Sequence, residues 1–258
     1  MRVIRLSHSG INYFARLVDD ATAQLWTAAP WLGGTETDRL VPVRSDTLLA
    51  PVAPSKILCV GRNYRAHAQE LGNDVPTEPL LFLKPPSSLL GPGASIALPP
   101  QSARVEHEGE VGIVIGSELR NATADQARKA IFGFTCVNDV TARDLQKKDV
   151  QFTRAKGFDT FCPVGPCVET DLTPDSLRVI TRVNGAVRQD GNTRDMVFPI
   201  DELLAFMSHI MTLAPGDLIV TGTPAGVGPL VHGDRVDVEV EGVGVLSNAV
   251  THASAKAT

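Results

Sequence analysis

The chain has 258 residues, of which 43% are hydrophobic and 21% are charged, and its formal net charge at pH 7 is −5. This composition is typical of globular proteins, and the length suffices for one large domain with a small appendage. The lysines and arginines form no basic stripe, so nucleic acid is not an expected partner. We expect no signal peptide in MRVIRLSHSG and no membrane-spanning segment, because no apolar run is long enough.

The first 52 residues contain two short apolar-rich segments, RVIRL and NYFARLV, separated by turn residues. This pattern predicts a small β-rich N-terminal domain over 1–52. The prolines in LLAPVAPSK then indicate a linker. A larger domain is expected over 53–250, and 251–258 is expected to be a disordered tail.

The larger domain begins with two predicted strands, at 57–61 and 80–84, and a short helix between them. Asn63 is the expected N-cap of that helix, which would run through Leu71 and stop at Gly72. A loop rich in proline and glycine is expected from Pro85 to Pro100.

A long strand is expected from Arg104 to Gly116 because of its apolar run. The remaining expected elements are a helix over 123–131, a strand over 134–139, a hairpin at Asn184-Gly185, a helix over 199–213, and strands within 217–224 and 234–246. Short strands dominate, so the predicted fold class is α+β, mostly β.

The four cysteines, Cys59, Cys136, Cys162 and Cys167, have unrelated spacings. The C-x4-C spacing of Cys162 and Cys167 is not that of a usual zinc or redox pair. We therefore expect reduced thiols and a cytoplasmic protein.

Three carboxylates occupy alternate positions in VEHEGEVGIVIG: Glu106, Glu108 and Glu110. In a strand they would share one face, and their repulsion would be relieved by a bound divalent cation. A solvated strand face is the other interpretation. Asp139, at the end of the run CVND, is the best candidate for a further ligand, but it could instead be the N-cap of the segment TARDLQ.

Two further motifs carry side chains suited to acid–base chemistry. His67 and Glu70 are three residues apart on a predicted helix, so the carboxylate could orient the imidazole as a general base. A simple surface contact would explain the same spacing. Lys156 in TRAKGFD is either a functional lysine or a solvated one.

The motifs CVGRNYRAHAQE, LFLKP, VEHEGEVGIVIG, CVNDVTARDLQ, RAKGFDTFCPVGP, VNGAVRQDGNTRDMVF and GDLIVTGTPAGVGP follow in this order between about Lys56 and Val250. This series resembles the fumarylacetoacetate hydrolase family, in its small bacterial acylpyruvate hydrolase and 2-hydroxyhepta-2,4-diene-1,7-dioate isomerase branch. The resemblance implies a mixed β-roll catalytic domain, one Mg²⁺ or Mn²⁺ per subunit, a homodimer and a role in aromatic catabolism.

Matching motif to motif also assigns roles to residues. The resemblance implies that Glu108, Glu110 and Asp139 are metal ligands and that Glu106 is a neighbour. It implies catalytic roles for His67, Glu70 and Lys156, and substrate contacts for Arg143, Gln146 and Thr223. Gly109 lies between two ligands, where relatives often carry an apolar residue.

The function that the resemblance implies is hydrolysis of a C–C bond in an acylpyruvate, for example fumarylpyruvate, to pyruvate and a carboxylic acid. Isomerisation of a hydroxy-diene dioate or decarboxylation of oxaloacetate could use the same site. A catalytically silent metal-binding protein is an alternative of another class. The sequence does not specify the acyl group.

Overall fold

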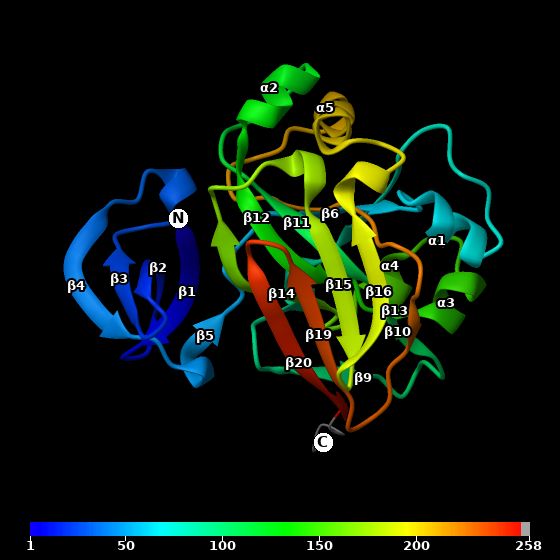
Figure 1. The fold of residues 1–258 in the computed structure, drawn as a ribbon, viewed down its shortest axis with the longest axis horizontal. Coiled ribbons are helices and arrows are strands. Elements are labelled where there is room, and N and C mark those ends of the chain that lie inside the picture. The colour runs from blue at the N-terminus through cyan, green and yellow to red at the C-terminus, as the bar shows by residue number, and fades with distance from the viewer. Residues whose placement is uncertain (254–258) are drawn as a thin grey trace.

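The computed structural model describes residues 1–253, in which strands predominate over five α-helices. These strands form three sheets. Figure 1 shows a small lobe of N-terminal strands beside a larger lobe that contains all five helices. The fold is therefore α+β and mostly β, as the sequence predicts. No helix in this part of the chain has the length and apolar character that crossing a membrane requires.

The largest sheet joins both lobes. In spatial order its main path is β4 (Glu36–Pro42), β3 (Thr22–Trp26), β2 (Ile11–Asp19), β1 (Arg2–His8), β14 (Cys162–Glu169), β12 (Ile131–Asn138), β11 (Gly109–Ile115), β17 (Leu218–Val220), β6 (Ile57–Gly61) and β7 (Leu80–Lys84). Two short strands attach to it: β5 (Leu48–Leu49) to β1 and β8 (Leu89–Leu90) to β14.

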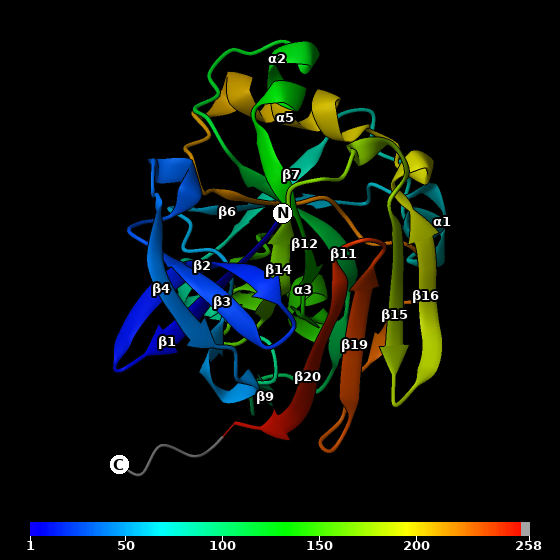
Figure 2. The same ribbon diagram turned by 60° about the vertical axis from the view of Figure 1, so that its left-hand side comes forward.

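The other two sheets belong to the larger lobe. One contains β13 (Thr141–Ala142), β10 (Val105–His107) and β18 (Gly228–Pro229). The other contains β16 (Ala186–Asn192), β15 (Arg178–Val183), β19 (Arg235–Val240), β20 (Gly244–His252) and β9 (Ser95–Leu98), and its four long strands lie side by side toward the right in Figure 2.

The helices are short. They are α1 (Arg65–Glu70), α2 (Ala124–Lys129), α3 (Arg143–Lys148), α4 (Thr153–Lys156) and α5 (Ile200–Ile210). Single 3-10 turns occur at Pro30–Leu32, Ser45–Thr47, Pro86–Ser88, Pro174–Ser176 and Thr193–Asp195. In both ribbon views α2 and α5 lie together at one end of the larger lobe. Figure 1 shows α1, α3 and α4 on another side, where the candidate site lies.

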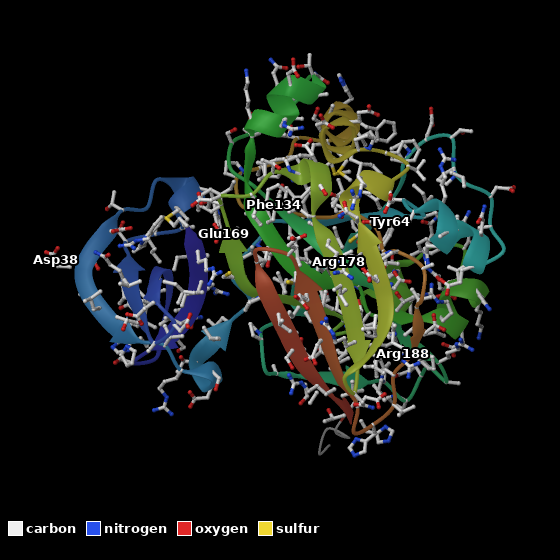
Figure 3. All side chains as sticks on the ribbon, in the orientation of Figure 1. Asp38, Tyr64, Phe134, Glu169, Arg178 and Arg188 are labelled. Atoms are coloured by element: carbon white, nitrogen blue, oxygen red, sulfur yellow. The ribbon has the colours of Figure 1, made fainter. Side chains whose placement is uncertain are left out.

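The N-terminal strands continue the main sheet edge to edge. Strand β1 pairs antiparallel with β14, with Arg2 opposite Glu169. The Arg2 Nε and Glu169 Oε2 atoms are 3.4 Å apart, and Figure 3 shows Glu169 at the junction between the lobes. The predicted strands RVIRL and NYFARLV are therefore confirmed as parts of β1 and β2.

Strand β11 is buried on both faces, which explains its almost unbroken apolar run. Val111 and Ile113 join an apolar cluster that includes Val238 of β19. Val114 faces the other way and joins a second cluster with Val220 of β17. This packing fixes the register of β11 against β12 and therefore the positions of the polar residues at their ends.

Three predicted elements have different bounds in the structure. The strand expected over 104–116 is broken at Glu108, because β10 pairs with β13 and β18 while β11 pairs with β12 and β17. The expected loop 85–100 includes β8 and β9, which are too short to show a periodic pattern. The helix expected over 199–213 ends at Ile210.

Other predictions are confirmed closely. The hairpin turn at Asn184-Gly185 has φ angles of 53° and 81°, which suit this pair. Thr123 caps α2 with a capping box through Gln126. The tail predicted over 251–258 is wrong for its first two residues, because β20 continues through His252. Residues 254–258 of that segment lie outside the described residues.

Candidate active site

Three buried carboxylates form the centre of the site: Glu108, Glu110 and Asp139. Their ligand atoms all lie within 4.8 Å of one another. Glu108 occupies the break between β10 and β11, Glu110 is the second residue of β11, and Asp139 follows β12 directly. Since Gly109 pairs with Asn138 across the two strands, Asp139 comes to lie beside Glu108, and its amide donates to the Glu108 carbonyl oxygen at 2.8 Å.

The alternative role for Asp139, as a helix N-cap, is wrong. Helix α3 begins at Arg143, and Ala142 occupies the N-cap position without a side-chain hydrogen bond. The Asp139 carboxylate instead accepts hydrogen bonds from two buried lysines, Lys84 at 2.7 Å and Lys156. The solvated-face interpretation of the acidic row is also wrong, because all three glutamates are at most 4% exposed.

Basic side chains compensate part of the acidic row. Lys156 Nζ donates to Glu108 Oε2 at 2.7 Å, and the Arg143 guanidinium donates to the other oxygen of Glu108. Arg143 Nε also donates to Glu106 Oε2 at 2.7 Å, while Arg104 binds the second oxygen of Glu106. Glu106 is therefore tied to arginines and lies outside the three-carboxylate cluster.

These contacts set the protonation states. Burial raises the pKa of Glu108, but the charges of Lys156 and Arg143 outweigh it, so this pKa lies well below its usual value. Burial lowers the pKa of Lys156, but the nearby carboxylates of Asp139 and Glu108 outweigh it and raise this pKa. Glu108 is thus a carboxylate and Lys156 an ammonium at neutral pH.

Glu110 differs from its neighbours. Within residues 1–253 it forms no ion pair, and its carboxylate accepts a hydrogen bond from the Gly222 amide. Burial and the charges of Asp139 and Glu108 raise the pKa of Glu110 well above its usual value. A divalent cation among the three carboxylates would relieve this repulsion, and carboxylate oxygens are its preferred ligands. The residues present therefore fit a metal site.

His67 and Glu70 lie on α1 and face the same cavity as the carboxylates. His67 Nδ1 is 3.4 Å from Glu70 Oε2, and the Gly226 amide donates to both oxygens of Glu70 at 3.0 and 3.1 Å. Burial lowers the pKa of His67, so its imidazole is neutral near pH 7. Glu70 thereby holds a neutral imidazole, as a general base requires.

Asn63 does not cap α1, contrary to the sequence prediction. Tyr64 occupies the N-cap position, and no side chain caps the helix. The Asn63 amide instead donates to the Thr221 carbonyl oxygen at 2.9 Å and accepts from the Phe198 amide at 2.9 Å. These bonds fix the start of α1 against the loop after β17, and Figure 3 shows Tyr64 near the end of β16.

The three residues predicted to contact the substrate all form hydrogen bonds with protein groups. Arg143 donates to Gln146 Oε1 at 2.5 Å as well as to the glutamates. The Thr223 hydroxyl donates to the Gly109 carbonyl oxygen at 2.9 Å and accepts from Gln189 Nε2 at 2.6 Å. Their roles toward a substrate stay predictions.

A cavity of about 450 Å³ unites these groups. All nine predicted site residues line it: His67, Glu70, Glu108, Glu110, Asp139, Arg143, Gln146, Lys156 and Thr223. Sequence analysis missed two residues that support them, Lys84 and Gln189. Lys84 could have been found in the sequence as a lysine at the end of the apolar run LLFLK. Nothing in the local sequence indicates Gln189, because its role depends on a contact with Gly109 of β11, which is distant in the chain.

Comparison with known proteins identifies the family. Residues 56–251 match the family described as fumarylacetoacetate (FAA) hydrolase C-terminal, and residues 1–51 match one described as Rv2993c-like, N-terminal. The chain belongs to the fumarylacetoacetate hydrolase family, and it is an enzyme of the hydrolase or isomerase type. The domain boundaries after residues 52 and 250 stay predictions.

Among its relatives is the mitochondrial oxaloacetate tautomerase Fahd2a of Rattus norvegicus, which is 44% identical over 223 residues, 82% of this chain and 71% of that protein. Two solved structures are 42% identical to this chain. The 2-hydroxyhepta-2,4-diene-1,7-dioate isomerase of Mycobacterium marinum has a TM-score of 0.90 and covers 99% of this chain and 100% of its own. The 5-carboxymethyl-2-hydroxymuconate delta-isomerase of Mycobacterium smegmatis has a TM-score of 0.91 and covers 98% of this chain and 100% of its own.

Proposed function

We propose that the protein hydrolyses a C–C bond in acylpyruvates, such as fumarylpyruvate, with the help of a divalent metal ion. The products are pyruvate and a carboxylic acid. The observation that carries this proposal is a neutral, carboxylate-held imidazole, His67, in one cavity with three buried carboxylates and a buried ammonium. A homodimer and a role in aromatic catabolism, both implied by the family resemblance, are part of the same proposal, as is the cytoplasmic location expected from the cysteines.

Glu108, Glu110 and Asp139 would hold Mg²⁺ or Mn²⁺. When bound, the ion would polarise the 2-keto group of the substrate and offset negative charge on its oxygen. The ammonium of Lys156 lies against two of these carboxylates, so it adds a fixed positive charge at the same place. Stabilising the charge that develops there lowers the barrier to cleavage.

His67 supplies the base. Its imidazole takes a proton from water while the water oxygen attacks the acyl carbonyl, with Glu70 holding the ring. The C–C bond between that carbonyl and the methylene carbon then breaks, and its electron pair forms the enolate of pyruvate. The imidazolium of His67 returns the proton to the methylene carbon, so that one water is consumed for each pyruvate and carboxylic acid formed.

Tautomerisation or isomerisation of a 2-keto acid is the second candidate. It is favoured by relatives that are an oxaloacetate tautomerase and two isomerases of unsaturated hydroxy acids. The same enolate would form, but His67 would move a proton between carbon and oxygen without activating water. Oxaloacetate decarboxylation would also use the enolate and would depend less on His67.

Product analysis separates these reactions. The protein would be stripped with EDTA, supplied with Mg²⁺ or Mn²⁺, and given acylpyruvates, oxaloacetate and a hydroxy-diene dioate. We expect metal-dependent release of pyruvate and the carboxylic acid in equal amounts. A product of unchanged mass would change the assigned function from hydrolysis to isomerisation. Release of pyruvate and carbon dioxide would change it to decarboxylation.

A further inference from the structure

We propose that Arg62 binds a second, distal carboxylate of the substrate, so that the enzyme prefers 2-keto dicarboxylic acids. The inference rests on the proposed function and deepens it, because it specifies the acyl side of the substrate. Arg62 lines the same cavity as the carboxylate cluster and His67, but it has no role in the chemistry described above.

The pairing of the other buried cations in the cavity leaves Arg62 available to bind an anionic ligand. Arg143 and Lys156 also line the cavity, but each is held by carboxylates of the protein. Within residues 1–253 the Arg62 side chain forms neither an ion pair nor a hydrogen bond, although it is half-buried. A half-buried guanidinium without a counter-ion beside an open cavity favours an anionic ligand, and its planar donors match a carboxylate.

The backbone at Arg62 is held in a conformation that costs free energy. Its φ is 58°, in the left-handed region, which a residue with a Cβ adopts at a cost of about 1 kcal/mol or more. The conformation is maintained because the next residue, Asn63, is anchored on both sides by hydrogen bonds to Thr221 and Phe198. The turn between β6 and α1 therefore fixes the start of the Arg62 side chain at the cavity wall.

The rest of the wall suits the carbon chain of such a substrate. Leu71, Leu80, Phe82 and Phe152 line the cavity, and the rings of Phe82 and Phe152 meet edge to face with centroids 5.6 Å apart. A volume of about 450 Å³ lies within the range of sites that enclose small organic ligands. Lys147 also lines the cavity without an ion pair among the described residues, but it is exposed, so salt would screen its attraction.

A pair of unreactive ligands tests the inference. 2-Oxoadipate and 2-oxohexanoate share the 2-keto acid end and the chain length, but only the first ends in a carboxylate. Their affinities would be measured by calorimetry in the presence of Mg²⁺. We expect wild-type protein to bind 2-oxoadipate at least about tenfold more tightly, as a hydrogen-bonded charge pair provides.

Variants then localise the preference. Arg62→Gln should weaken 2-oxoadipate binding about tenfold and leave 2-oxohexanoate within about twofold, and Arg62→Lys should keep part of the preference. Arg65→Gln is the matched control: it removes an exposed arginine three residues away that does not line this cavity, and it should change neither affinity. Thermal unfolding would confirm that each variant folds.

The other outcomes separate the two proposals. If both ligands bind wild-type protein equally, or if Arg62→Gln weakens both to the same extent, the distal-carboxylate role is overturned while the 2-keto acid site stands. If wild-type protein binds neither ligand in Mg²⁺, the proposed function fails and the role of Arg62 fails with it.

Discussion

Replacing Lys84 by methionine should destabilise the metal-free protein far more than the metal-bound protein. Lys84 is 1% exposed, and its Nζ donates to Asp139 Oδ1 at 2.7 Å and to the Val140 carbonyl oxygen at 3.3 Å. The substitution removes one buried positive charge beside three buried carboxylates. Breaking a buried ion pair by removing one partner costs about 3 to 5 kcal/mol, because the remaining charge is left uncompensated.

Thermal unfolding with EDTA and with Mg²⁺ measures this effect. At about 3 kcal/mol, and about 2 to 4 °C per kcal/mol for a chain of this size, the Tm in EDTA should fall by about 6 to 12 °C. Mg²⁺ should raise the Tm of Lys84→Met more than that of wild-type protein, because the cation replaces the lost charge.

Lys129→Met is the matched control, since Lys129 is exposed on α2 and forms no ion pair among the described residues. Its Tm should change little. The reasoning would be refuted if Lys84→Met behaved like Lys129→Met in EDTA, or if Mg²⁺ stabilised Lys84→Met no more than wild-type protein.

Three further predictions concern the surroundings of the cluster. Gln189→Leu should lower the free energy of unfolding by about 2 kcal/mol or more and also reduce kcat/KM, because Gln189 forms hydrogen bonds with both Gly109 and Thr223. Urea titration and steady-state kinetics measure the two effects, and an unchanged kcat/KM would count against a positioning role for Gln189. Gly109→Ala should lower the free energy of unfolding by about 1 to 3 kcal/mol, because a Cβ there would lie 1.9 Å from Thr181 Oγ1. Adding Thr181→Ala should restore part of that free energy in the same titration, and no restoration would contradict the clash. Burial lowers the pKa of His107 below 6.5, so the unfolded chain takes up a proton at a higher pH than the folded chain, and this group should lower the wild-type free energy of unfolding below pH 6.5 by at most about 1.4 kcal/mol per pH unit. His107→Gln should make that decrease smaller, and an unchanged decrease would contradict the assignment to His107.

The nine site residues predicted from the sequence line one cavity, whereas the sequence offers no prediction of the strand order. Glu108 and Glu110 are two residues apart in one motif, and strand spacing predicts a shared face for them, but it predicts the same for Glu106. Only the family resemblance separates Glu106 from the other two. The partners of these carboxylates depend on pairings between distant segments. Lys84 reaches Asp139 across 55 residues of chain, and Gln189 reaches Gly109 across 80. Local periodicity carries no information about such pairings.

Two local interpretations, the N-cap predicted at Asn63 and the N-cap alternative for Asp139, are wrong for a common reason. Asn63 and Asp139 both precede short helices and have side chains typical of N-caps. In the structure each side chain has stronger partners: backbone groups of two distant segments for Asn63, and two buried lysines for Asp139. Tertiary hydrogen bonds and buried charges therefore override the capping preference where the chain builds the site.

Calorimetric titration of Mn²⁺ into EDTA-treated Glu110→Gln tests the central claim, a metal site made by three carboxylates. Glu110 is the best residue to change because it forms no ion pair in residues 1–253, so its loss leaves no buried lysine or arginine uncompensated. Asp159→Asn, which removes an exposed carboxylate outside the cluster, is the matched control.

We expect wild-type protein and Asp159→Asn to bind one Mn²⁺ per chain. Glu110→Gln should fold with a metal-free Tm at or above that of wild-type protein, because repulsion from Glu108 and Asp139 is removed, and it should bind no Mn²⁺. Binding of Mn²⁺ by folded Glu110→Gln with wild-type affinity would contradict the account.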